Sequence, residues 1–280
     1  MILSFHPCVV TDENRICAGR QPDHQDLAAI RRASAVILPQ GCPESLYRMA
    51  RENCVHLFPH HETRFAYPGK IGQIHLFNSH GVRIPPSRCF PDLATYIRQH
   101  PDPARPPLGF PLVLKLNWGG EGDTVYPIAD HQALKEIFGM VAAQEATGQA
   151  AFILQSRIDT QPRGGALRVA VIGRRLTAYW RISGKENPFH SSLSRGARID
   201  DQLRPDLQRK GIAATEKFCL QSGINLAGFD LIFSRQELDP EPLFLEINYF
   251  FGRRGLGGSQ QFYQYLNQEV SAWLAEHNLQ

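Results

Sequence analysis

The sequence lacks the cysteine patterns that indicate disulfide-stapled or zinc-binding proteins. Its six cysteines are scattered, with no C-x-x-C pair and no metal-ligand spacing, so we interpret them as reduced thiols. The N-terminus lacks a basic segment followed by a long apolar run, and no uncharged apolar stretch of about 18 residues occurs anywhere. These absences predict a soluble, cytoplasmic protein with no membrane span.

The chain also has little net charge. Its 30 lysines and arginines stand against 27 aspartates and glutamates, and the net charge of +3 is too small to indicate a nucleic-acid partner. What the sequence does have is length and apolar surface. Its 280 residues, of which 42% are hydrophobic, are enough for two or three packed lobes. We expect a globular protein whose affinity for anions is local.

Residues 1 to about 60 have the rhythm of a small β-α-β-α-β unit. Asp23 precedes a helical pattern and is a candidate helix N-cap, and Pro43 marks a break before the next helix. This lobe carries no glycine-rich phosphate fingerprint. The apolar runs and helical patterns alternate in the order 2–5, 27–33, 35–38, 44–51 and 55–58.

The rest of the chain alternates between helical and strand patterns. Residues 101–109 are the most proline-rich stretch, and they predict a loop because proline fits neither a helix interior nor a central strand. The polar connection 234–242 joins two apolar strands into a final hairpin. We expect helices at 68–79, 131–146, 205–222 and 260–277, and strands at 111–115, 151–158, 167–183 (in two parts around Gly173), 226–233 and 242–250.

Acidic residues interrupt both strands of this final hairpin. Glu246 and Asn248 are two apart, so their side chains share one face of the strand. If the hairpin pairs symmetrically about its loop, Phe233 faces Leu243 and Asp230 faces Glu246. Two carboxylates opposite one another repel unless a cation or a proton lies between them.

These oxygen ligands suit Mg²⁺, with Mn²⁺ as a second possibility. The alternative is that both acids lie on a solvated face of the sheet. The metal site is the favoured interpretation, because both strands are otherwise strongly apolar and an unpaired charge buried there is costly.

Two lysines are candidates for phosphate contacts. Lys115 ends an apolar strand and is followed by Gly119, Gly120 and Gly122, whose backbone N–H groups could approach phosphate oxygens. The alternative is an ordinary hairpin turn, which is the commoner meaning of such a pattern. Lys70 on its own is best explained as a solvated helix residue.

Arginines surround a segment, residues 182–198, that is rich in loop-forming residues. Arg181 and Arg195 beside a metal site could neutralise phosphoryl oxygens or hold a carboxylate. A surface role is the simpler explanation for Arg198 and for the pair at 253–254. Residues 60–62, His-His-Glu, indicate a polar connection between lobes rather than a metal cluster.

The order of these features resembles the ATP-grasp superfamily, most closely its RimK-type and glutathione-synthetase-like branch of carboxylate–amine ligases. The resemblance covers residues 70–280. Its most specific parts are LAGFDLIF with FLEIN, the strands LRVAVIGRRLTAYWRIS, and HSSLSRGA, which looks like the arginine-bearing loop of the family. It implies a mixed α/β (α+β) fold in which two α+β subdomains clasp ATP, preceded by the small N-terminal lobe.

The resemblance also assigns roles to residues. It implies that Mg²⁺ ions are held by Asp230, Glu246 and Asn248, and that Arg181 and Arg195 lie near an acyl-phosphate. It implies that the adenine is read by the backbone of a hinge at residues 155–158. The residues that would contact ATP by this resemblance are Lys70, Lys115, Gly119, Gly120, Gln155, Ser156, Arg157, Ile158 and Ser192.

The implied domain boundaries are 1–62 for the N-terminal lobe and 63–280 for the ATP-grasp domain. Within the latter, the lid would span about 110–156 and the metal-binding subdomain about 157–280. The implied activity is ATP-dependent ligation of a small-molecule or peptide carboxylate to an amine, without a nucleic-acid or membrane partner. The oligomeric state stays open.

Three departures from the family pattern motivate an alternative. Ala166 stands where an acidic residue is common, His190 where an arginine is, and Ser192 where an asparagine is. An ATP-binding regulatory or partner protein without ligase chemistry is therefore the second hypothesis. A kinase acting on a small alcohol is the third.

Overall fold

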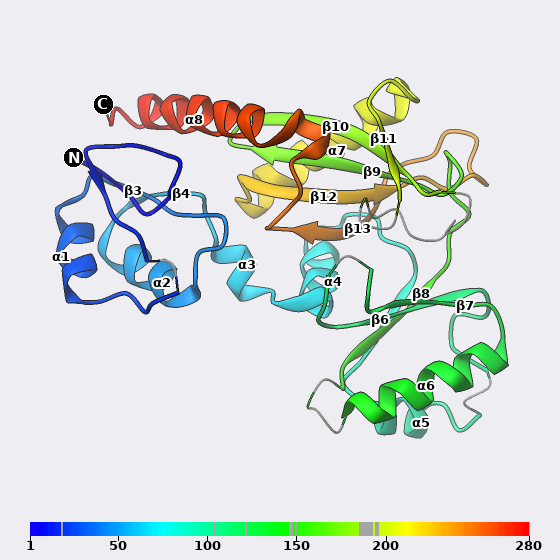
Figure 1. Cartoon of the computed structure of the whole chain (residues 1–280). Helices are drawn as coiled ribbons and strands as arrows, with labels where there is room; N and C mark the ends of the chain where they lie inside the picture. The colour runs from blue at the N-terminus through cyan, green and yellow to red at the C-terminus, as the bar shows by residue number, and fades with distance from the viewer. Residues whose placement is uncertain are drawn as a thin grey trace.

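The chain forms three sheets in a computed structural model that describes residues 1–17, 19–102, 105–120, 122–145, 148, 150–184, 193 and 196–279. In Figure 1 the N-terminal lobe (blue) lies at the left. The β9–β13 sheet lies at the upper right, and the β5–β8 sheet with its helices lies below it.

The N-terminal lobe is a parallel sheet in the order β2-β1-β3-β4. Asp23 caps the first helix by accepting hydrogen bonds from the backbone N–H groups of Gln25 and Asp26, which confirms the predicted N-cap. The two-residue strand β2 was not expected. The elements are β1 (Ile2–Ser4), β2 (Glu13–Asn14), α1 (His24–Arg32), β3 (Ala35–Ile37), α2 (Glu44–Asn53) and β4 (His56–Phe58).

The second sheet is antiparallel, in the order β5-β8-β6-β7. Helix α5, which the sequence pattern did not predict, is capped by Asp92 through the backbone N–H of Thr95. The elements are β5 (Ser87–Phe90), α5 (Leu93–Gln99), β6 (Leu112–Leu116), β7 (Val125–Ile128), α6 (His131–Glu145) and β8 (Phe152–Ser156).

The third sheet is also antiparallel, in the order β11-β10-β9-β12-β13. Helix α7 has the bounds that the sequence predicts, with proline in its first turn and Gly223 in the left-handed region at its end. The remaining elements are α3 (Glu62–Ala66), α4 (Gly69–Ser79), β9 (Gly165–Ile172), β10 (Arg175–Ile182), β11 (Arg198–Asp200), α7 (Pro205–Ser222), β12 (Leu226–Ile232), β13 (Leu243–Asn248), η2 (Arg254–Leu256) and α8 (Gly258–Glu276).

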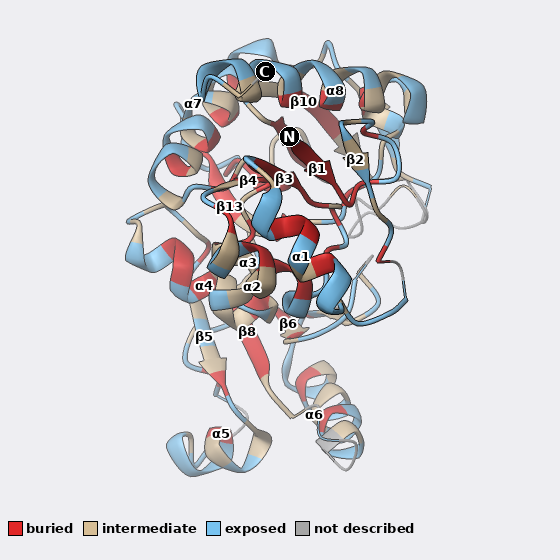
Figure 2. Cartoon of the chain, turned by 90° about the vertical axis from the view of Figure 1, so that its left-hand side faces the viewer, coloured by how far each residue is buried: buried red, intermediate tan, exposed pale blue. Residues whose placement is uncertain are grey.

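Both faces of the third sheet are covered. One face packs against α4 and α7 around Phe77, Phe218 and Phe229, and the other packs against α8 and the N-terminal lobe. All residues of β9 are consequently buried, which explains its continuous apolar run. Figure 2 shows the same pattern, with buried residues in the strands and exposed residues on the outward faces of the helices.

No helix in the part of the chain that the structure describes is long and apolar enough to cross a membrane. All six cysteines are free thiols, and three of them (Cys17, Cys42 and Cys54) are buried in the N-terminal lobe. The interpretation of scattered, unpaired cysteines is therefore confirmed.

Phe218 offers a test of this core. Its ring is fully buried and lies 5.6–5.9 Å from the rings of Phe77, Phe229 and Phe244. Phe218→Ala leaves a cavity among these aromatics, and we expect the free energy of unfolding in urea to fall by about 3–5 kcal/mol. The matched control is Leu220→Ala on the exposed side of the same helix, where the loss should be well below about 1 kcal/mol. Equal losses in the two variants would contradict the packing described.

Candidate functional site

Two carboxylates face each other across the last hairpin. Asp230 of β12 pairs with Glu246 of β13, as the sequence predicts, and Gly228 pairs with Asn248. The expected pairing of Phe233 with Leu243 is wrong, because Ile232 takes that place. An irregularity in the register next to Asp230 absorbs the difference of one residue.

Asp230 is held by two arginines, one from the adjacent strand β9 and one from β10, the strand beyond it. Arg168 of β9, its direct partner in the sheet, donates from Nε to Oδ1 at 2.6 Å and from Nη2 to Oδ2 at 3.1 Å. Arg181 of β10 lies with Nη2 2.6 Å from Oδ1, and Asn248 donates from Nδ2 to Oδ2 at 3.1 Å. We call these four residues the Asp230 cluster. Both oxygens of the carboxylate are thus engaged within the protein.

The two carboxylates of the hairpin have opposite electrostatic environments. Burial alone would raise the pKa of Asp230, but the charges of Arg168 and Arg181 and their hydrogen bonds outweigh it and lower the pKa to about 2. Burial and the charge of Asp230 raise the pKa of Glu246, and Lys70 and Lys115 offset this only in part. Glu246 is therefore the carboxylate whose burial and negative charge are not fully offset by neighbouring cations.

The side-chain oxygens that have no hydrogen-bond partner at this site suit a hard cation. Glu246 forms no hydrogen bond or ion pair within the described residues, and Asn248 uses its Nδ2 on Asp230, so its Oδ1 remains as an acceptor. Carboxylate and amide oxygens are the ligands that Mg²⁺ prefers. No group of three or more His, Cys, Asp or Glu side chains placed to hold a metal exists among these residues. A metal here would take ligands from Glu246 and Asn248, with Asp230 already engaged by its arginines.

Lys70 and Lys115 reach this site from outside the third sheet. Burial lowers the pKa of Lys70, and burial lowers the pKa of Lys115 to about 8, while Glu246 opposes the shift in both cases. Lys70 is 8% exposed and lies on α4, so the interpretation as a solvated helix residue is wrong. The two lysines and the two arginines outnumber the two carboxylates, which leaves the site positive.

The glycines after Lys115 lie in the turn of the β6–β7 hairpin, and a turn of this kind can also bring its backbone N–H groups to a phosphate. Gly119 has φ of 110°, a conformation that favours glycine, and its carbonyl oxygen accepts a hydrogen bond from Nζ of Lys70 at 2.7 Å. Gly120 is exposed beside it. The turn is thereby joined to the start of α4 at the edge of the site.

The predicted hinge is only partly available to a ligand. The backbone N–H of Ser156 donates to the carbonyl of Pro86 at 2.8 Å, and that of Arg157 donates to Pro111 at 3.1 Å. Gln155 is buried, with Nε2 donating to Oγ of Ser87. Within the described residues the N–H of Ile158 forms no hydrogen bond, so it is the donor of this segment left for a ligand.

Two of the predicted site residues, Ser192 and Arg195, lie outside the described residues, as does His190. Arg198 is exposed and pairs with Asp200, two residues further along β11, which agrees with a surface role. Arg253 lies over the rings of Phe262 and Tyr263 rather than in the Asp230 cluster.

Three residues of the site were not selected from the sequence. Arg168 interrupts the apolar strand β9 just as Asp230 interrupts β12, and this signal was sufficient to find it. Asn117 accepts the N–H of Ile71 through its side chain and that of Lys70 through its carbonyl. Gln73 exchanges two hydrogen bonds, at 2.8 and 2.9 Å, with the backbone of Ile247. Nothing in the local pattern distinguishes Asn117 or Gln73 from surface residues.

The fold and this arrangement of charges define an α+β domain with a positively charged site between its two antiparallel sheets. A sequence profile of the RimK-like ATP-grasp domain matches residues 74–261, which include most of both antiparallel sheets and the acid pair. The chain therefore belongs to the RimK-like ATP-grasp family, whose domains bind ATP.

Curated relatives match part of the chain. It is 30% identical over 149 residues to a probable alpha-L-glutamate ligase of Picosynechococcus sp., covering 53% of this chain and 45% of the relative. It is 25% identical over 194 residues to a probable alpha-L-glutamate ligase of Chromohalobacter salexigens, covering 67% and 57% respectively. The chain thus spans about half the length of the curated relatives it matches.

Solved structures resemble the whole chain. A RimK domain ATP-grasp protein from Sphaerobacter thermophilus has a TM-score of 0.59 at 13% identity, covering 96% of this chain and 98% of that one. D-cycloserine synthetase DcsG has a TM-score of 0.62 at 15% identity, covering 98% and 99%. At these identities the likeness establishes the shared fold, which is the fold expected from the sequence.

The two carboxylates should respond to neutralisation in opposite ways. Asp230→Asn leaves two buried arginines without their anion, and we expect the free energy of unfolding at pH 7 to fall by about 3–5 kcal/mol. Glu246→Gln removes a carboxylate whose charged form is disfavoured by folding, and we expect unchanged or greater stability. Urea titrations of both variants measure the difference.

The pH dependence of the free energy of unfolding tests whether the charge of Asp230 stabilises the fold. The pKa of Asp230 is lowered on folding from 3.8 to about 2, so its stabilising charge is fully present above about pH 4 and is lost as the pH falls towards 2. The gap between the wild type and Asp230→Asn should therefore narrow over this range. A gap that stays constant down to pH 2 would mean that the charge of Asp230 does not stabilise the fold.

Proposed function

We propose that this protein is an ATP-dependent carboxylate–amine ligase that acts through an acyl-phosphate. The observation that carries the proposal is that two lysines and two arginines surround two carboxylates at the junction of the two antiparallel sheets, and that Glu246 forms no hydrogen bond or ion pair within the described residues. A polyanion with a divalent cation complements such a site. Relatives described as probable alpha-L-glutamate ligases support the same reaction class.

The lysines and the acid pair have separate roles in this proposal. Lys70 and Lys115 would contact the phosphates of ATP, and their lowered pKa values reflect how far burial has stripped them of water. Glu246 and Asn248 would hold Mg²⁺, which would neutralise phosphate charge when bound. Gly119 and Gly120 would cover the phosphates, and the backbone of residues 155–158 would meet the adenine.

The Asp230 cluster would orient the guanidinium groups on which the chemistry depends. Nε of Arg181 is buried without a hydrogen-bond partner among the described residues, whereas Nη2 is fixed by Asp230. A guanidinium group that is held at Nη2 and has an unpaired Nε is suited to bind an anion that forms during the reaction. Arg195 would act beside it, and Ser192 would contact phosphate.

In the reaction, a substrate carboxylate oxygen attacks the γ-phosphorus of ATP, and the bond from that phosphorus to the bridging oxygen breaks to release ADP. The amine nitrogen then attacks the acyl carbon, an amide bond forms, phosphate leaves with the former carboxylate oxygen, and the amine loses a proton to solvent. Every step needs positioning and charge neutralisation, and none needs a side-chain nucleophile.

This assignment gives each part of the chain a separate role. The N-terminal lobe, residues 1–62, would help to form the acceptor site for a small-molecule or peptide substrate. Residues 63–280 would be the ATP-grasp domain, with a lid at about 110–156 and a metal-binding part at about 157–280. We also propose a cytoplasmic location, which the six free thiols support.

A nucleotide-binding regulatory protein is the second candidate. Ala166, which is 4% exposed and pairs with Arg181, brings no acidic side chain to this position on β9. Tight ATP binding by calorimetry, without ADP formation across a broad acceptor screen, would favour this candidate over the ligase.

ADP release measured with pools of amino acids and peptides tests the ligase. Wild-type protein with Mg²⁺ and ATP should release ADP only when both an acid and an amine are supplied. Glu246→Ala should lose ATP binding and turnover together by at least about tenfold, because the cation loses its charged ligand. The control Glu52→Ala changes an exposed glutamate of α2 and should behave like the wild type. Unchanged nucleotide binding in Glu246→Ala would rule out this metal site.

A further inference from the structure

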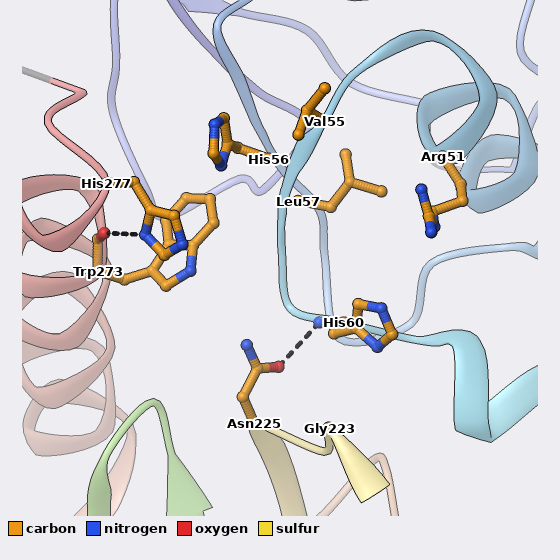
Figure 3. A pocket seen from close by; sticks show the side chains of 9 residues that line it. All are labelled: Arg51, Val55, His56, Leu57, His60, Gly223, Asn225, Trp273 and His277. Carbon is orange, nitrogen blue, oxygen red and sulfur yellow. Dashed lines mark hydrogen bonds between the residues drawn. The ribbon is translucent and has the colours of Figure 1, made fainter. Parts of the chain in front are cut away.

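A cavity lies where the N-terminal lobe meets the C-terminal helix. It has a volume of about 420 Å³ and is lined by residues of α2, of β4 and the segments on either side of it, of the turn between α7 and β12, and of the C-terminal end of α8 (Figure 3). We call it the junction cavity. None of the residues assigned above to ATP or to the metal lines it. Its volume falls in the range of small-molecule sites, roughly 300–1,000 Å³.

One end of the junction cavity is cationic. Arg51 of α2 forms no hydrogen bond or ion pair with another described residue, and in Figure 3 its guanidinium lies on the same side of the cavity as the His60 ring. Nδ1 of His60 is buried without a partner in the described part of the chain. Among the described residues that line the cavity there is no aspartate or glutamate, so none of them offsets the charge of Arg51. An arginine in this situation favours a carboxylate or another oxyanion.

The opposite end of the junction cavity is aromatic. The ring centroids of Trp273 and His277 lie 4.9 Å apart, and those of His277 and His56 lie 5.0 Å apart. Nδ1 of His277 lies 2.8 Å from the carbonyl oxygen of Trp273, which fixes the imidazole (Figure 3). Leu57 and Val55 add apolar surface between the two ends. A planar apolar group would pack against such a wall.

The junction cavity is anchored on both sides. Oδ1 of Asn225, the residue before β12, accepts the backbone N–H of His60 at 2.8 Å, and this bond joins the lobes beside the cavity. Arg51 and Trp273 belong to different lobes, so an occupant that touches both would bridge them. The three histidines form no metal-binding group within the described residues, which leaves an organic anion as the ligand that this chemistry suits.

We propose that the junction cavity binds a small organic acid with a planar apolar body. Its carboxylate pairs with Arg51 beside His60, and its ring packs against Trp273 and His277. This site is separate from the ATP site, and its test does not depend on the ligase reaction.

Benzoate is the probe, and the readout is the indole N–H resonance of Trp273 in a ¹⁵N–¹H spectrum of the full chain. Trp273→Phe identifies that resonance by its disappearance. We expect benzoate to shift it in a saturable manner, and Arg51→Ala to weaken binding by about tenfold or more, because a charge-assisted pair is lost. Arg209→Ala, at an exposed arginine of α7, should bind benzoate like the wild type.

Two further arms decide between the proposal and its competitors. Benzamide has the same ring without the charge, and it should bind at least about tenfold more weakly than benzoate if Arg51 recognises the carboxylate. Saturating Mg²⁺ and ATP should leave the benzoate titration unchanged. Equal binding of benzamide, unaltered affinity in Arg51→Ala, displacement by ATP, or no shift of the Trp273 resonance would each overturn the proposal.

Discussion

The carboxylate of Asp230 is the interaction on which the middle of this molecule depends. It lies between β9 and β13 in a sheet whose two faces are both buried, and it neutralises Arg168 and Arg181 where water cannot. A slip of one residue in β12 would send the carboxylate to the other face and leave two guanidinium groups among apolar side chains. The contacts of Asp230 with the two arginines therefore bring the site residues together and also fix the register of three strands.

The two antiparallel sheets are joined at the site by one helix. Helix α4 contacts β13 through Gln73 and Ile247, and it contacts the end of β6 through Asn117. Lys70 extends this connection to the carbonyl of Gly119. Residues that bind ATP in our proposal are thus held by a helix whose contacts pair backbone groups with the side chains of Lys70, Gln73 and Asn117, so the geometry depends on these three side chains.

Much of this arrangement could be predicted from the sequence, because buried strands leave a plain apolar pattern and a charge inside such a run is conspicuous. Asp230 and Glu246 were found in this way, and helix α7 was located with its observed bounds. Helix α5 and strand β2 are too short for periodicity to detect. Asn117 and Gln73 act through partners 46 and 174 residues away, and a local pattern contains no information about such contacts.

The partners of each group were harder to predict than the groups themselves. Asp230 was expected to be a metal ligand, which stays a prediction, and its contacts with Arg168, Arg181 and Asn248 were not predicted. The hinge was expected to present free backbone groups, and two of its N–H groups are already bonded. In both cases the residue type shows that a polar group is present, whereas tertiary contacts decide which partner that group binds.

The irregular register beside Asp230 has a consequence for how this hairpin tolerates change. On one side of it the strands pair as Asp230 requires, and on the other side they pair one residue out of step, towards the connection at 234–242. The connection is tied to the rest of the fold by ion pairs of Glu237 with Arg83 and of Glu241 with Lys210. Because the register changes only beyond Asp230, the strands can meet this connection one residue out of step while Asp230 and Glu246 keep their pairing.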